Sequence, residues 1–107
     1  MNFLEEQTII NSMEQHAKGI KEMYGIPSNV QVYTEETEDP SICYLGYSFT
    51  WKEEPVIIKM KYIKNEVHQL SGIQQENYWH VKHGIHESSQ HRTLGDAFDV
   101  LNIKRVG

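Results

Sequence analysis

Residues 42–51 have the sequence Ile-Cys-Tyr-Leu-Gly-Tyr-Ser-Phe-Thr-Trp. In an extended chain, successive side chains point to opposite faces, so every second residue shares a face. One face of this segment carries Cys43, Leu45, Tyr47, Phe49 and Trp51, and the other carries Tyr44, Gly46, Ser48 and Thr50. The unbroken period of two and the many aromatic side chains predict a long β-strand with one buried and one wetter face.

A helix is predicted before this strand, over residues 3–24. Apolar side chains recur there at helical spacing, and Gly25 and Pro27 follow as end signals. Asn2 and Glu5 have the spacing of a capping box that would begin the helix. The apolar stripe has two interpretations, packing on the domain's own sheet or pairing with a second copy in a homodimer. Its seven-residue repeat is short for a coiled coil, so we expect packing within the chain.

The remaining segments alternate between strand and turn patterns. Further strands are predicted at residues 30–34, 56–63, 67–73 and 77–83, with solvated polar connections at 35–40 and 84–92. Residues 56–63 should pair antiparallel with residues 42–51. Thr93 is the expected N-cap of a short final helix, with Leu94, Ala97, Phe98 and Leu101 on one face.

These elements predict a single α+β domain spanning residues 1–107. We expect two layers, in which an antiparallel meander sheet of four to five strands carries the long N-terminal helix and the short C-terminal helix on one face. The core face of that sheet would hold Leu45, Phe49, Ile58, Met60, Trp79 and Val81.

Composition narrows the function classes. The chain has 107 residues and a net charge of −5. Residues 1–40 contain eight acidic residues and two lysines, which excludes a uniformly basic nucleic-acid footprint. Neither a signal-peptide pattern nor an apolar membrane span is evident, and Cys43 is the single cysteine. We therefore expect a cytoplasmic protein without membrane attachment.

The histidines suggest a metal site. Five of the six lie between residues 68 and 91, at His68, His80, His83, His86 and His91. Imidazole is a common ligand of transition metals, and a turn at Gly84 could bring His83, His86 and His91 together. The alternative is that these histidines are separate surface or half-buried residues.

The wetter sheet face suggests a binding surface. It is predicted to carry Tyr44, Lys59, Lys61, Tyr78, His80 and Lys82, and His68 could join them. Cations beside aromatic rings can bind single-stranded nucleic acid or another anionic ligand, and exposed tyrosines can anchor a protein partner. The alternative is an antiparallel sheet that simply leaves one face wet.

Catalysis is not favoured by the sequence. Cys43 belongs to the apolar face, where burial disfavours the reactive thiolate, so we expect a core residue. Gly-rich phosphate loops and a nucleophile elbow are absent from the sequence. The sequence thus favours a non-enzymatic binding protein without a cofactor, acting as an adaptor, inhibitor or regulator of another macromolecule, most naturally another protein. Nucleic-acid binding and metal-dependent activity at residues 80–91 are the alternatives.

Overall fold

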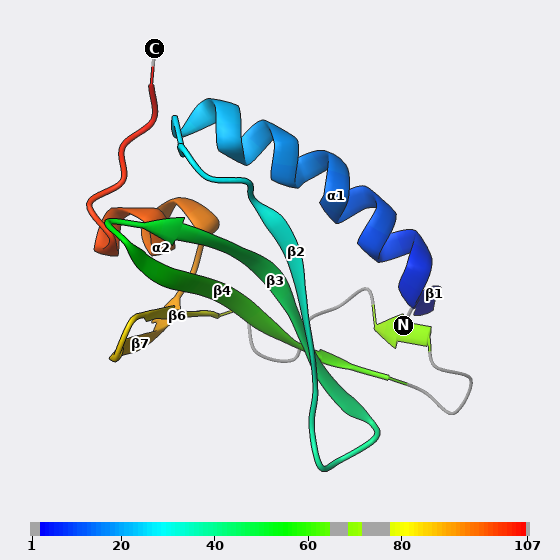
Figure 1. Cartoon of the computed structure of the whole chain (residues 1–107). Helices are drawn as coiled ribbons and strands as arrows, with labels where there is room; N and C mark the ends of the chain where they lie inside the picture. Colours follow the sequence, from blue (N-terminus) through cyan, green and yellow to red (C-terminus); the bar gives the residue numbers. More distant parts are fainter. Residues whose placement is uncertain (1–2, 65–68, 72–77, 107) are drawn as a thin grey trace.

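Strand β3, Ile42–Trp51, is the long strand that the alternating pattern predicts (Figure 1). The computed structural model describes residues 3–64, 69–71 and 78–106. β3 pairs antiparallel with β2 (Gln31–Glu36) on one side and with β4 (Glu54–Ile63) on the other. Its predicted inward face is buried, with Trp51 half-buried at the end, so Cys43 is a core residue as expected.

Two further strands complete a five-stranded sheet. These are β6 (Trp79–His83) and β7 (His86–His91), and the strand order is β2-β3-β4-β6-β7 with every pair antiparallel. β7 corrects the prediction of a polar loop over residues 84–92. Its sequence, His-Glu-Ser-Ser-Gln-His, is polar throughout and lacks the alternation of apolar residues by which a strand is predicted.

The segment predicted as a strand at residues 67–73 contributes differently. β5 (Gln69–Ser71) lies outside the main sheet and pairs with β1 (Phe3–Glu5) in a two-stranded ribbon. β6 therefore takes the place beside β4 that this segment was expected to fill, and β7 adds the fifth strand beyond it. The helix prediction was wrong at its start. Residues 3–5 form a strand instead of the first helical turn, because they pair with β5, which is distant in sequence.

Helix α1 runs over Glu6–Met23, and its N-cap Glu5 makes no side-chain capping bond. Asn2, the expected cap, lies outside the described residues. Helix α2 (Leu94–Val100) begins as predicted, because the amide N–H of Asp96 donates to Thr93 Oγ1 at 3.0 Å. None of the described helices is both long and apolar enough to cross a membrane.

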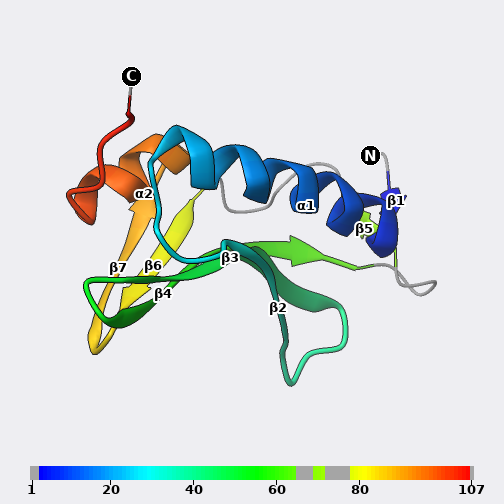
Figure 2. The same ribbon diagram turned by 45° about the horizontal axis from the view of Figure 1, so that its top comes forward.

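Both helices lie on the same side of the sheet, which gives a two-layer α+β fold (Figure 2). The apolar stripe of α1 is buried within the chain through Met13, Ala17 and Ile20. Phe98 of α2 is fully buried and stacks on Phe49 of β3, with ring centroids 5.9 Å apart. Packing of the helices on the domain's own sheet is therefore confirmed.

Gly46 lets two strands approach each other closely. It lies opposite Lys59 in the β3–β4 register, and a Cβ at this position would lie 1.8 Å from the carbonyl oxygen of Ile58. Real Cβ atoms do not approach other atoms so closely, and a strand backbone cannot move aside as a flexible side chain can. The pairing of β3 with β4 therefore requires glycine here.

The substitution Gly46→Ala should lower the free energy of unfolding by at least about 2 kcal/mol, because the strands must separate to accept the methyl group. Gly19 is the matched control, since a Cβ there meets nothing within 4 Å. Gly19→Ala, inside α1, should raise stability by about 0.5–1 kcal/mol. Urea denaturation followed by circular dichroism measures both. Equal stability of the two variants would contradict the close backbone approach.

Candidate binding groove on the open sheet face

The face of the sheet away from the helices carries most of the predicted binding residues. The antiparallel register aligns them in rows across the strands. The rows are Glu35–Tyr44–Lys61, then Tyr33–Gly46–Lys59–His80, then Gln31–Ser48–Ile57–Lys82–Glu87. The structure thus places five predicted residues, Tyr44, Lys59, Lys61, His80 and Lys82, on one face; their role in binding stays a prediction.

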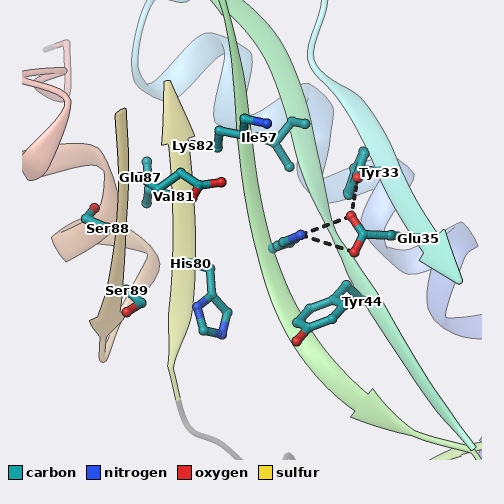
Figure 3. Close-up of a pocket in the computed structure, with 11 residues that line it drawn as sticks. Tyr33, Glu35, Tyr44, Ile57, His80, Val81, Lys82, Glu87, Ser88 and Ser89 are labelled. Carbon is teal, nitrogen blue, oxygen red and sulfur yellow. Dashed lines mark hydrogen bonds and ion pairs between the residues drawn. The ribbon is translucent and has the colours of Figure 1, made fainter. Parts of the chain in front are cut away.

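A hollow of about 350 Å³ lies on this face (Figure 3). We call it the open-face groove. Its aromatic side chains are Tyr33, Tyr44 and His80; its charged side chains are Glu35, Lys59, Lys82 and Glu87; Ile57, Val81, Ser88 and Ser89 complete the lining. All five strands of the main sheet contribute, so the main-chain pairing fixes the shape of the groove.

A hydrogen-bonded network crosses the groove. Lys59 of β4 reaches over β3 at Gly46, and its Nζ lies 2.9 and 3.2 Å from the two carboxylate oxygens of Glu35 on β2. The hydroxyl of Tyr33 donates to Glu35 Oε1 at 2.5 Å. Because Gly46 has no side chain, nothing from that residue stands between Lys59 and Glu35.

The network sets the ionisation of two of its members. The hydrogen bond from Tyr33 and the contacts with Lys59 hold the pKa of Glu35 below its usual range. The same hydrogen bond to an anion, with partial burial, raises the pKa of Tyr33 to about 12. At neutral pH, Glu35 is therefore a fixed anion and Tyr33 a neutral donor.

Tyr44 is held between two neighbours in the groove. The Lys59 ammonium lies 4.7 Å from the centroid of its ring, within the range of a cation–π contact. The ring of His80 meets Tyr44 edge to face, with centroids 5.9 Å apart and planes at 79°. The half-buried Tyr44 ring is consequently preorganised rather than free to rotate into solvent.

The lysines of this face have carboxylates nearby. Glu35 binds Lys59, and Glu87 of β7 stands directly opposite Lys82 of β6. The pKa of Asp39 is lowered mainly by hydrogen bonds from Ser41, and the charge of Lys61 lowers it further. The face is thus close to charge balance instead of presenting a row of uncompensated cations.

Of the other predicted members of the face, Tyr78 is among the described residues and His68 is not. Tyr78 precedes β6, is 36% exposed and does not line the groove. Sequence reasoning in turn missed Glu35, which lies inside β2 instead of opening a solvated connection. Tyr33 and Glu35 are two positions apart and so share a face of an extended strand, which was the signal that could have identified Glu35.

The structure does not bring His83, His86 and His91 together. His83 and His86 face each other across the tight β6–β7 hairpin, but His91 pairs with Trp79 at the far end of β7. His91 is five residue steps along the strand from His86, which corresponds to about 17 Å. Within the described parts of the chain, no group of three or more His, Cys, Asp or Glu side chains could hold a metal ion.

Two of these histidines, His83 and His91, have other contacts. His83 Nε2 lies 3.0 Å from the backbone oxygen of Trp51 and 3.6 Å from a carboxylate oxygen of Glu54. His91 Nε2 lies 2.8 Å from the Ser88 hydroxyl. Their roles in the described structure are local hydrogen bonds at the ends of the hairpin strands.

Fold and groove together define a small two-layer α+β domain with an open, groove-bearing sheet. Residues 3–102 match the sequence model of a family of unknown function, DUF5634, and the chain belongs to this family. No curated protein matches the chain.

The substitution Glu35→Gln should lower the pKa of Tyr33 from about 12 toward the ordinary tyrosine value of about 10, because the anionic acceptor is lost. Tyr47 is the internal control. Its pKa is also raised to about 12, but by burial and by Tyr62, so it should not change. NMR titration of the tyrosine ring signals up to about pH 11 separates the two residues. An unchanged Tyr33, or a parallel change in Tyr47, would contradict the network.

Proposed function

We propose that this domain is a non-enzymatic binding protein that recognises another protein through the open-face groove. The observation that carries the proposal is Tyr44, a tyrosine fixed between Lys59 and His80 on the sheet face that the two helices leave open. A rigid aromatic side chain costs little conformational entropy when a partner packs on it. Tyrosine is also among the residues that most often dominate protein interfaces.

The chemistry of the groove supports a polypeptide ligand. Tyr33 and Tyr44 offer hydroxyls on apolar rings, Ile57 offers an aliphatic contact, and Ser88 and Ser89 offer adaptable hydrogen bonds. Tyrosine combined with serine is the mixture with which antibody paratopes bind proteins. A volume of about 350 Å³ is at the small end of ligand pockets, which suits one or two partner side chains.

The charge balance makes a protein partner preferable to nucleic acid. A nucleic-acid site gains affinity from lysines that are free to neutralise phosphates. Here Lys59 is already neutralised by Glu35, and Lys82 faces Glu87. A phosphate entering the groove would meet two carboxylates as well as two lysines.

Two features support a non-catalytic role. Glu35 has a lowered pKa and accepts hydrogen bonds from both Tyr33 and Lys59, which makes it a weak base. Cys43 is 1% exposed on the helix-covered face and does not line the groove. We keep the cytoplasm as the proposed compartment, which a single cysteine suits.

The test compares Tyr44→Ala with Tyr78→Ala. Tyr78 is an exposed tyrosine outside the groove and serves as the matched control. Proteins cross-linked to the intact domain in cells should be lost with Tyr44→Ala and kept with Tyr78→Ala. Calorimetry with the purified partner should then show at least a tenfold weaker affinity for Tyr44→Ala, about 1.4 kcal/mol.

Two results would overturn this proposal. One is equal binding of the partner by both variants while both remain folded. The other is binding of a fluorescent single-stranded oligonucleotide that weakens steeply with salt and depends on Lys59 and Lys82, which would assign the groove to nucleic acid.

A further inference from the structure

A second surface of the domain lies at the edge of the main sheet. β2 is an end strand of this sheet, and within the described residues it pairs only with β3. The backbone N–H and C=O groups on the other side of such a strand can accept a further strand. All six residues of β2 are in unbroken register with β3, so this edge is regular over its whole length.

The opposite edge of the sheet, formed by β7, is less suited to accepting a further strand. β7 has a register irregularity opposite Trp79 and Val81, and Gln90 near its end has a φ of 67°. Such irregularities are a common means of preventing strand addition. The sequence of β2, Gln-Val-Tyr-Thr-Glu-Glu, contains neither lysine nor proline, and its two charged residues lie together at its C-terminal end.

A groove runs beside this edge, between α1 and β2, and its lining contains both apolar and polar side chains. It has a volume of about 410 Å³. Its apolar lining comes from Ile10 and Ala17 of α1, from Val30 just before β2 and from Val32 in β2. Glu14 and Lys18 of α1 also line it. It shares no lining residue with the open-face groove: Val32 and Thr34 of β2 line this groove, whereas Tyr33 and Glu35 line the other.

The C-terminal end of β2 is acidic. Glu36 keeps 69% of its side chain exposed although it pairs with Lys64, and Glu38 and Asp39 are exposed. Residues 1–40 as a whole contain eight acidic residues and two lysines. A basic segment would be attracted to this end, whereas a second copy of the chain would bring two acidic N-terminal regions together.

We propose that β2 accepts an extended segment of a partner protein as an additional strand. The segment places an apolar side chain in the groove between α1 and β2 and basic residues beside Glu36, Glu38 and Asp39. Main-chain hydrogen bonds to β2 supply affinity, and the groove and the carboxylates supply specificity. This site is independent of the open-face groove, and either can exist without the other.

The probe is a display library of random peptides of about ten residues, selected on the intact domain. Enriched peptides should carry an apolar residue with lysine or arginine toward one end. Thr34 is exposed and lines the groove, so Thr34→Lys adds a charge where the apolar side chain should enter. Affinity of the best peptide should fall at least tenfold in this variant.

Ser89→Lys is the matched control, because it adds the same charge at an exposed position of the open-face groove. It should leave peptide affinity unchanged. NMR hydrogen exchange should show slower exchange of outward-facing β2 amides when the peptide is bound, because they become hydrogen-bonded. Glu38→Gln should weaken binding and reduce its dependence on salt.

Four results would overturn the proposal. They are a lack of peptide enrichment, enrichment of acidic peptides, equal binding by Thr34→Lys, and dependence on Ser89 instead of Thr34. Light scattering on the unliganded domain adds one more outcome: a dimer abolished by Thr34→Lys would show that the edge binds a second copy. Each result is distinct from the Tyr44 comparison, because the two sites share no lining residue.

Discussion

The salt bridge between Lys59 and Glu35 joins two strands that are not neighbours, and it depends on the glycine between them. Lys59 lies on β4 and Glu35 on β2, so the lysine must cross β3, which it does at Gly46. Both side chains are about one-third exposed, and such pairs contribute little to stability. The contact instead organises the groove, because it places the ammonium beside Tyr44 and fixes the anion that Tyr33 donates to.

The parts of the fold that the sequence predicts are those governed by local pattern. β3 has the predicted bounds because its alternation is unbroken, and α2 begins at Thr93 because the cap is a contact between residues three positions apart. β1 and β7 could not be found in this way. β1 exists through pairing with β5, distant in sequence, and its apolar residues equally suit a helical stripe. β7 is polar, and its strand conformation comes from pairing with β6.

The same distinction applies to the candidate site. Alternation along β3, β4 and β6 was enough to place Tyr44, Lys59 and His80 on one face. Their interaction with Glu35 was not predictable, because it depends on the register of β2 and on the absence of a side chain at Gly46. For the histidines, the sequence suggested a contact that the structure does not contain. Proximity in sequence suggested a cluster, but an extended strand carries His86 and His91 apart.

β2 connects the two candidate binding surfaces. Tyr33 and Glu35 point into the open-face groove, whereas Val32 and Thr34 line the groove beneath α1. The acidic excess of the N-terminal region is divided in the same way. Glu35 forms an ion pair with Lys59 inside the domain, but Glu36, Glu38 and Asp39 remain accessible at and after the end of the strand. Since one short backbone positions both sets of side chains, any segment added to the edge of β2 would also restrain the strand that holds Glu35 against Lys59.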